Sequence, residues 1–392
     1  MTLGFEEARE CVLRNASRGR QTEPVRLLEA AGRVLAEPIA ADRDYPPFHR
    51  AARDGFAVRA ADLPGQLHVI GEVRAGHLFP TAIGPGEAVE IMTGAPLPEG
   101  SDAVVMIEHV TRSHDRICVE RILQPGENYS PRGIEARKGE LVLTAGRRLE
   151  FAEIAALAMV GRECAQVYKK PRVAIIPTGD EIVEPAQRPE PFQIRNSNAY
   201  SLACQVSRAG GVPEILPIAR DNYASTRGVI ERGLEADLVL LSGGVSAGKY
   251  DMVEKVLADL GAEFFFDRVK IQPGQPLVYG TVGGNQFFGL PGNPISTMVT
   301  FEVFARAAVE LLGGVSQAPL PLLTARLSTD FRHKPGLTRF LPARVKESAE
   351  VAPEPWHGSG DIVAVTRANA FLVADADRET WAKGEEIRVL LR

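Results

Sequence analysis

Three short glycine-containing segments are the parts of this sequence best suited to binding a ligand. Each follows an apolar run of the length expected for a buried strand. The segments are Thr178-Gly179-Asp180-Glu181, Ser242-Gly243-Gly244-Val245-Ser246 and Pro291-Gly292-Asn293-Pro294. Glycine lets the backbone approach a ligand closely, and free amides at the start of a helix attract anions such as phosphate. One such segment is usually only a turn, but three at one sheet edge predict a bound nucleotide-like molecule.

Acidic residues accompany these segments, namely Asp180, Glu181, Asp221 and Asp251. For Asp221 and Asp251 two interpretations stay open, a catalytic role and the capping of a helix, because aspartate favours caps and turns. Together, the carboxylates would repel a phosphate unless a divalent cation bridged them. Mg²⁺ does this with one or two carboxylates plus phosphate oxygens. The pattern therefore predicts metal-assisted cleavage or transfer at a phosphoanhydride.

A phosphate-binding P-loop is a rival interpretation of the second segment. Residues 243–249 match the G-x-x-x-x-G-K part of that motif. The next residue is Tyr250, however, where a P-loop needs Ser or Thr as a magnesium ligand. We interpret the match as chance and Lys249 as a solvated loop lysine. The seven histidines show no metal-ligand spacing, and no H-E-x-x-H is present.

Composition excludes several classes of protein. The 392 residues include 45 Lys plus Arg and 50 Asp plus Glu, a net charge of −5, so nothing points to nucleic acid. The four cysteines are widely spaced, which favours a reducing compartment over disulfides or a structural zinc site. The N-terminus lacks the apolar stretch of a secretory signal, and no run approaches the roughly 18 apolar residues of a membrane span. We expect a cytoplasmic protein without membrane contact.

The elements that must position these residues fall into four regions, so the expected fold class is multidomain α/β plus β. Helical spacing at Phe5, Ala8 and Val12, and again from Val25 to Leu35, predicts two opening helices. Short β-prone runs follow, and another helical pattern comes after them, so we expect an inserted β domain within a discontinuous helical domain. The expected divisions are 1–46 with 139–170 (helical), 47–138 (inserted β), 171–316 (α/β sheet) and 317–392 (small C-terminal β).

Strand-like and helix-like runs alternate from Pro171 onward. The expected strands lie at 173–176, 215–216, 238–241, 263–269 and 287–290, and the expected helices at 198–209, 223–234, 252–260 and 295–312. This alternation is typical of a doubly wound parallel sheet, whose ligands bind at the carboxyl ends of the strands.

Read with their neighbours, the segments resemble the molybdopterin molybdenumtransferases, the MoeA and gephyrin E-domain family. The resemblance runs over nearly the whole chain, and the four regions correspond to the four domains of the family. Its most specific motifs are Arg53-Asp54-Gly55-Phe56-Ala57-Val58-Arg59, Met92-Thr93-Gly94-Ala95-Pro96-Leu97-Pro98-Glu99-Gly100, Asp102-Ala103-Val104-Val105, Pro171-Arg172-Val173, the three glycine segments, and Gly289-Leu290 before the last of them.

The resemblance implies a reaction and a set of partners. Adenylylated molybdopterin and molybdate would give molybdenum cofactor and AMP with Mg²⁺, on a MogA-like sheet domain. The protein would be an elongated homodimer, with each site shared between the sheet domain of one subunit and the inserted β domain of the other.

The resemblance also implies roles for individual residues. Asp54 and Thr93 would be catalytic from the second subunit, and Glu181, Asp221 and Asp251 would act around the metal and the pyrophosphate. The nucleotide and pterin would be held by Ser242, Gly243, Gly244, Ser246, Pro291, Gly292, Asn293, Pro294 and Ser296. Arg339 and Ser359 match positions implicated in oxyanion binding, and an arginine fork suits an oxyanion. A surface arginine and a turn serine remain the alternative for these two.

The sequence departs from the family at three places. Ala51-Ala52 stands where a serine is common, and Glu135 stands where an aspartate is frequent. The lysine-bearing loop of the family is replaced by Gln272-Pro273-Gly274-Gln275, which removes two cations from the oxyanion side. Three alternatives therefore remain: a paralogue acting on another nucleotide, one using another oxyanion, and a non-catalytic scaffold.

Overall fold

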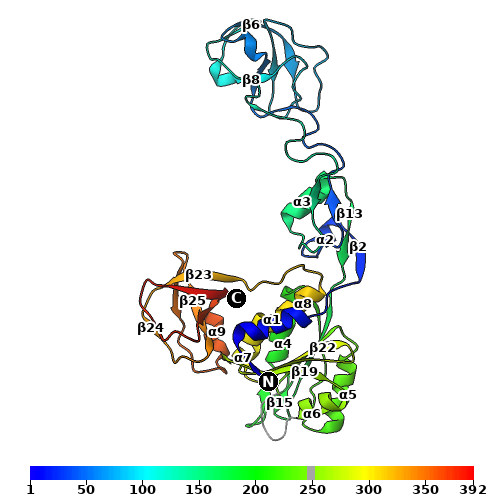
Figure 1. The fold of residues 1–392 in the computed structure, drawn as a ribbon, viewed down its shortest axis with the longest axis vertical. Coiled ribbons are helices and arrows are strands. Elements are labelled where there is room, and N and C mark those ends of the chain that lie inside the picture. The colour runs from blue at the N-terminus through cyan, green and yellow to red at the C-terminus, as the bar shows by residue number, and fades with distance from the viewer. Residues whose placement is uncertain (245–251) are drawn as a thin grey trace.

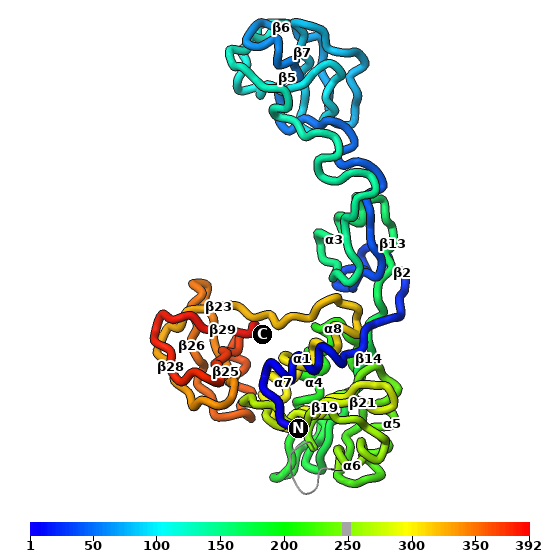
Figure 2. Tube along the Cα trace, viewed as in Figure 1, coloured from blue at the N-terminus to red at the C-terminus, as the bar shows by residue number. Residues whose placement is uncertain are grey.

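The chain is elongated in its computed structural model, which describes residues 1–244 and 252–392 (Figure 1). The inserted β domain lies at one end, and the sheet domain and the C-terminal β domain lie at the other. The middle domain, formed by residues 22–40 and 141–168, stands between them. Figure 2 shows the chain running out to the inserted domain and returning alongside itself. No helix within the two described ranges combines the length and apolarity needed to cross a membrane.

The sheet domain contains a seven-stranded sheet in the order β1-β19-β21-β22-β18-β14-β17. In chain order the strands are β1 (Thr2–Leu3), β14 (Arg172–Pro177), β17 (Val212–Ile215), β18 (Leu238–Ser242), β19 (Glu263–Val269), β21 (Pro276–Val282) and β22 (Asn285–Leu290). Strands β22, β18, β14 and β17 run parallel, as expected. Strand β21, which the sequence analysis did not anticipate, runs antiparallel to β19 and β22.

Helices cover both faces of this sheet. They are α4 (Asn198–Arg208), α5 (Tyr223–Gly233), α6 (Met252–Asp259), α7 (Pro294–Thr300), the π-helical turn η3 (Phe301–Ala305) and α8 (Arg306–Leu312). Alternate residues of β18 enter two cores. Leu238 and Leu240 pack with α4, α7 and α8, whereas Val239 and Leu241 pack with α5 and α6. The prediction of a doubly wound sheet is confirmed, because helices pack on both faces of the sheet. A strand that is buried on both faces needs a continuous apolar run, as β18 has.

Helix α1 (Phe5–Asn15) lies on the sheet domain rather than in the middle domain, to which the sequence analysis assigned it. Phe5, Ala8 and Val12 are buried in the same core as α4 and α8. The buried Arg9 donates from Nη1 to the carbonyl of Val303 at 2.8 Å, inside the π-helical turn. Helical spacing located this helix, but it could not predict the packing partners, which are far away in the sequence, in α4, η3 and α8.

The middle domain contains one of the two expected helical patterns and replaces the other with a strand. Its elements are β2 (Thr22–Arg26), α2 (Leu27–Ala30), β3 (Ile39–Ala40), β12 (Leu141–Leu143), α3 (Phe151–Met159) and β13 (Cys164–Tyr168). The helix expected from Val25 to Leu35 is wrong, because β2 pairs antiparallel with β13 along its whole length. Only four residues, those of α2, are helical there. The pairing joins the two flanks of the insertion.

The inserted β domain is a six-stranded sheet in the order β8-β5-β7-β6-β10-β9. Its elements are β4 (Arg50–Ala51), β5 (Gly55–Val58), the 3₁₀ turn η1 (Ala60–Asp62), β6 (Gly65–Val73), β7 (Glu87–Ile91), β8 (Ala103–Met106), the 3₁₀ turn η2 (Ile107–His109), β9 (Thr111–Ser113), β10 (Arg116–Val119) and β11 (Tyr129–Ser130). The expected small β domain is confirmed. The sequence analysis missed β5, whose residues it used only as a motif.

The C-terminal domain is a closed ring of strands in which β25 pairs with β26 and β27, β23 with β26 and β29, and β27 with β29. Its elements are β23 (Leu322–Leu327), β24 (Phe331–Arg332), β25 (Thr338–Val345), β26 (Glu350–Pro353), α9 (Ile362–Arg367), β27 (Ala370–Ala374), β28 (Thr380–Trp381) and β29 (Glu386–Leu391). Strand β20 (Ile271–Gln272) follows β19 in the chain and pairs with β25. This pairing attaches the ring to the sheet domain beside the carboxyl edge of the sheet.

Candidate active site

A cavity of about 1110 Å³ lies at the carboxyl edge of the sheet, between the three glycine segments, the β20 loop and the C-terminal domain. Twelve of the proposed site residues line it, namely Glu181, Asp221, Ser242, Gly243, Gly244, Gln272, Gln275, Pro291, Gly292, Asn293, Ser296 and Ser359. Pro294 and Arg339 are not among its lining residues, although Pro294 directly follows Asn293. Ser246 and Asp251, together with Lys249 of the P-loop alternative, lie outside the described residues.

The segment after β14 is held from the side by Arg220, a residue that the sequence analysis missed. Its Nη1 donates to the carbonyls of Gly179 at 3.3 Å, Asp180 at 3.2 Å and Ile182 at 3.1 Å. Gly179 has a φ of +133°, and a Cβ placed there would lie 2.5 Å from Oε2 of Glu181. The Glu181 carboxylate therefore folds back over a position that only glycine can occupy.

Asp180 and Asp221 are joined by two reciprocal hydrogen bonds, in which the backbone amide of each residue donates to the carboxylate of the other. The amide of Asp221 donates to Oδ1 of Asp180 at 3.2 Å, and the amide of Asp180 donates to Oδ2 of Asp221 at 3.4 Å. The N-cap of α5 is Asn222, whose side chain accepts from Ser225 at 2.9 Å. The capping interpretation of Asp221 is therefore wrong, and its carboxylate lines the cavity instead.

Asn198 links the second and third glycine segments, and sequence reasoning missed it as well. Its Nδ2 donates to Oγ of the buried Ser242 at 3.0 Å and to the carbonyl of Gly292 at 2.8 Å. Asn198 is the first residue of α4, so the helix start is fastened to two strand ends at once. Its position after a strand and before a helix was the available signal, but only the fold reveals the two partners.

The cavity is negative on its described walls. Glu181 and Asp221 are the charged side chains among the described lining residues, and neither Lys nor Arg occurs there. Lys270 is exposed and does not line the cavity. Arg339 is the register partner of Gln272 across β20 and β25, and its Nε is buried without a hydrogen-bond partner within the described ranges. The nearby donors are therefore amides and hydroxyls rather than lysines.

Asp54 and Thr93 are in contact within the inserted β domain and are not among the residues that line this cavity. Figure 1 shows the inserted β domain at the opposite end of the chain from the sheet domain. The backbone amide of Thr93 donates to Oδ1 of Asp54 at 2.6 Å. Two hydrogen bonds from Thr93 hold the pKa of the exposed Asp54 below its usual range. The larger effect comes from the backbone amide and the smaller one from the side chain. The two motifs that carry these residues therefore form one local unit.

Comparison with known proteins covers nearly the whole chain. Three family models match in order: the MoeA N-terminal region (domain I and II) at residues 3–161, a probable molybdopterin binding domain at 174–311, and the MoeA C-terminal region (domain IV) at 324–391. The molybdopterin molybdenumtransferase of a Nostoc species is 34% identical over 387 residues, covering 94% of this chain and 88% of the relative. That of Staphylococcus epidermidis is 32% identical over 378 residues, covering 94% and 90%.

Solved structures agree with the sequence comparison. A molybdopterin biosynthesis moeA protein from Pyrococcus horikoshii aligns with a TM-score of 0.84 at 30% identity, and the alignment covers 100% of both chains. A second structure of the moeA protein from Pyrococcus aligns at 0.77 with 33% identity, covering 100% of this chain and 99% of the other.

The glycine conformations at the cavity can be tested with a matched pair of substitutions. Gly243 has a φ of +100°, and a Cβ there would lie 2.9 Å from Oγ1 and 3.0 Å from the carbonyl oxygen of Thr178. At Gly292 the nearest atom to a Cβ is Cα of Gly243 at an ordinary 3.7 Å. We expect Gly243→Ala to destabilise the chain by about 1–3 kcal/mol, and Gly292→Ala to change stability far less. Equal melting temperatures for the two variants would contradict the described loop geometry.

Proposed function

We propose that this chain, which belongs to the family of molybdopterin molybdenumtransferases, inserts molybdenum from molybdate into molybdopterin presented in adenylylated form, with release of AMP. Like its relatives, the chain is a transferase of molybdenum cofactor biosynthesis. The cavity at the sheet edge carries the proposal for the adenylylated substrate, because it combines two carboxylates with three backbone-lined segments. That combination suits a pyrophosphate linkage bridged by a cation.

Mg²⁺ is part of this proposal, and the donor set of the cavity fits it. Glu181 and Asp221 both line the cavity, and Mg²⁺ commonly uses one or two carboxylates plus substrate phosphates. No cluster of three or more acidic, histidine or cysteine ligands occurs within the described ranges, so the substrate would complete the coordination. When bound, the ion would neutralise charge that develops at the phosphoanhydride. Asp251 remains a proposed third acid.

The other cavity residues would bind and orient the substrate. Gly243 and Gly244 have φ values of +100° and +65°, so their backbone can approach the phosphates where no side chain intervenes. Asn198 keeps Ser242 and Gly292 at fixed separation, and Arg220 keeps the Glu181 segment in place. Such positioning lowers the entropic part of the barrier, because the reacting groups are already aligned.

We further propose a homodimer in which Asp54 and Thr93 complete the site of the partner subunit. Within one chain the inserted β domain, to which these residues belong, and the sheet domain, which carries the cavity, lie at opposite ends with the middle domain between them (Figure 1). The middle domain also exposes large apolar side chains, among them Leu28 and Phe151, each 88% exposed. These side chains belong to α2 and α3, which pack against each other. Such a surface suits a contact between two copies, which would bring the distant ends together.

The proposed cellular location is the cytoplasm. All four cysteines, Cys11, Cys118, Cys164 and Cys204, are free thiols. Free thiols suit a reducing compartment.

The role of Asp221 can be separated from stability. Asp221→Asn removes the charge but keeps an oxygen that can accept from the amide of Asp180. We expect at least about a tenfold loss in the rate of AMP release, equivalent to ~1.4 kcal/mol of barrier, with an unchanged melting temperature. The matched control is Glu231→Gln, an exposed carboxylate of α5 that pairs with Arg227 outside the cavity. Near-normal turnover by the folded Asp221→Asn protein would remove this residue from the mechanism.

Sharing of the site between subunits can be tested by complementation. Asp54→Ala and Glu181→Ala chains should each be inactive alone, because each lacks one side of every site. A mixed dimer of the two should contain one intact site and regain AMP release. The assay needs proof of subunit exchange, for instance by copurification through a tag on one chain. Exchange without recovered activity would rule out the trans arrangement.

The glutamine loop should weaken use of the oxyanion while leaving the adenylate chemistry intact. Gln272 and Gln275 line the cavity where the resembling family carries lysines, and charge-assisted hydrogen bonds are worth roughly 1.5–3 kcal/mol. We expect a high molybdate requirement in the natural protein and a lower one in a Gln272→Lys, Gln275→Lys variant. Titration with molybdate and with tungstate measures this and also tests for a different preferred oxyanion. An unchanged or raised requirement would show that these glutamines do not face the oxyanion.

A further inference from the structure

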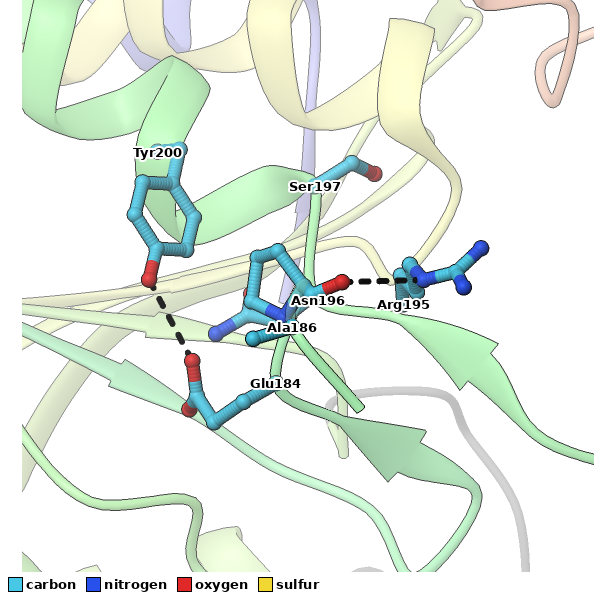
Figure 3. Close-up of a pocket in the computed structure, with 7 residues that line it drawn as sticks. Glu184, Ala186, Arg195, Asn196, Ser197 and Tyr200 are labelled. Atoms are coloured by element: carbon cyan, nitrogen blue, oxygen red, sulfur yellow. Dashed lines mark hydrogen bonds between the residues drawn. The ribbon is translucent and has the colours of Figure 1, made fainter. Parts of the chain in front are cut away.

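A hollow of about 570 Å³ beside the active-site cavity is lined by polar side chains that bond to residues close in sequence (Figure 3). It adjoins the ribbon of β15 (Ile182–Val183) and β16 (Ile194–Arg195). The Tyr200 hydroxyl donates to Oε2 of Glu184 at 3.3 Å, and Nε of Arg195 donates to the Pro185 carbonyl at 3.0 Å. These partners are 16 and 10 positions apart in the chain, so the bonds stabilise one local turn.

Arg9, in contrast, joins segments that are far apart in the chain. It is 7% exposed, and it donates from Nη1 to the Val303 carbonyl at 2.8 Å and from Nη2 to the Ala318 carbonyl. Val303 lies in the π-helical turn η3, and Ala318 lies in the segment 313–321, which leads from the sheet domain to the C-terminal domain. We call this segment the linker. Arg306 donates to the next carbonyl of the linker, that of Pro319, at 2.9 Å.

The charge of Arg9 makes its two hydrogen bonds strong. Arg306 pairs with Glu310 at 3.0 Å and with Glu302 at 3.7 Å, whereas the guanidinium of Arg9 faces backbone carbonyls. Burial, followed by the charge of Arg306, lowers the pKa of Arg9 to about 10, so the group stays charged at neutral pH. Hydrogen bonds from a charged donor are shorter than neutral ones and roughly twice as strong. Arg9 therefore fixes the η3 turn and the linker relative to α1.

Helix α1 also contacts the C-terminal domain directly. Phe5, four residues before Arg9, lies on the same face of the helix. Its ring centroid is 5.5 Å from that of Phe340 in β25 and 6.1 Å from that of Phe304 in η3, edge to face in both pairs. Apolar contacts of this kind contribute burial, but the hydrophobic effect has no direction. The directional contacts that set the position of the C-terminal domain here are therefore those of the arginines.

A single helical segment connects Arg9 to the active-site cavity. The elements α7, η3 and α8 follow one another without a break from Pro294 to Leu312, where the linker begins. At the other end of this segment the Ile295 amide donates to the carbonyl of Ser359, a cavity residue of the C-terminal domain. The C-terminal domain is thus attached to both ends of one helical segment. A shift of the linker end would displace the cavity end as well.

We propose that Arg9 is a positioning residue, which holds the C-terminal domain over the active-site cavity by joining α1, the η3 turn and the linker. Arg9 does not line the cavity itself. The residues that it positions are Ser359 and, through the pairing of β20 with β25, Gln272 and Arg339. The positioning stands independently of the reaction, whereas its consequence for the oxyanion rests on the proposed function.

Fluorescence of the natural tryptophans tests the positioning without any substrate. The chain has two tryptophans: Trp356 lines the cavity from the C-terminal domain, and Trp381 is 3% exposed in the core of that domain. Because Trp381 is shielded while the domain is folded, quenching by acrylamide measures access to Trp356. Arg9→Met keeps an unbranched side chain but removes both donors, so we expect a larger quenching constant well below the melting temperature. Arg14→Met, at an exposed position of the same helix, should leave the constant unchanged.

The same measurement separates positioning from a merely structural role. An arginine that only stabilises the fold would lower the melting temperature of Arg9→Met and leave the quenching of Trp356 as in the natural chain. That result would overturn the proposal. If Arg9→Met does not fold, Arg9→Lys decides, with Arg14→Lys as its control. Lysine keeps the charge but lacks the planar fork that reaches two carbonyls, so we expect increased quenching, and an unchanged constant would overturn the proposal.

Titration with AMP and with molybdate connects the positioning to the proposed reaction. We expect Arg9→Met to bind AMP as the natural chain does, because the sheet-domain segments would hold the nucleotide. Its molybdate requirement should rise at least about tenfold, since misplacing a group by about 1 Å can cost about a hundredfold. Increased Trp356 quenching with an unchanged molybdate requirement would overturn the role in oxyanion use. If the natural chain itself makes no use of molybdate, the proposed function fails, and the quenching result still decides the positioning.

Discussion

Negative charge on the cavity walls is the constraint on which the rest of the site depends. Glu181 and Asp221 line the described part of a space proposed to hold a pyrophosphate and an oxyanion, and no lysine or arginine lines that part. The available donors are backbone amides, hydroxyls and the amides of Gln272 and Gln275. Glycine at positions 243 and 244 permits the left-handed conformations found there and leaves the backbone open to close approach by a ligand. The same charge favours the divalent cation proposed above, which would bridge these carboxylates and a phosphate.

Parallel strands explain why these groups meet. Strands β14, β18 and β22 run in the same direction, so the segments that follow them lie at one edge of the sheet. Two polar side chains then fix the segments relative to each other, because Asn198 joins Ser242 to Gly292 and Arg220 holds the carbonyls around Asp180. The edge of the sheet that lines the cavity is thus a set of short segments connected by several hydrogen bonds. Each of these hydrogen bonds reduces the conformational freedom that binding of a substrate would otherwise have to remove.

Whereas the parallel strands bring the cavity segments together, the middle domain keeps the inserted β domain away from the sheet domain. It separates the inserted β domain from the sheet domain of the same chain. Within the inserted domain, Asp54 and Thr93 are preorganised as a pair by a hydrogen bond. In the proposed homodimer, a second copy would bring this local unit to the cavity. The exposed apolar side chains of α2 and α3 suit that arrangement, since a contact between two middle domains would hold two elongated chains together.

Local pattern in the sequence was sufficient wherever the controlling interaction is also local. Apolar runs located β14, β18 and β22, alternation with helices predicted the doubly wound sheet, and glycine after each run marked the edge of the sheet that lines the cavity. The inserted β domain followed from short β-prone runs, although its strand β5 was concealed within a motif. The pattern of strands and helices only placed the glycine segments and the acidic residues at one edge of the sheet. Candidate roles for the individual residues came from the motifs that resemble the family.

Tertiary structure decided whatever depends on a partner distant in sequence. It assigned α1 to the sheet domain, turned the expected second helix into β2 paired with β13, and showed that Asn222 rather than Asp221 caps α5. It also revealed Asn198 and Arg220, whose significance lies entirely in the atoms that they contact. Periodicity records which side of an element is apolar, but not which distant element covers that side. A hydrogen bond between residues far apart in the chain leaves no trace in the spacing of either one.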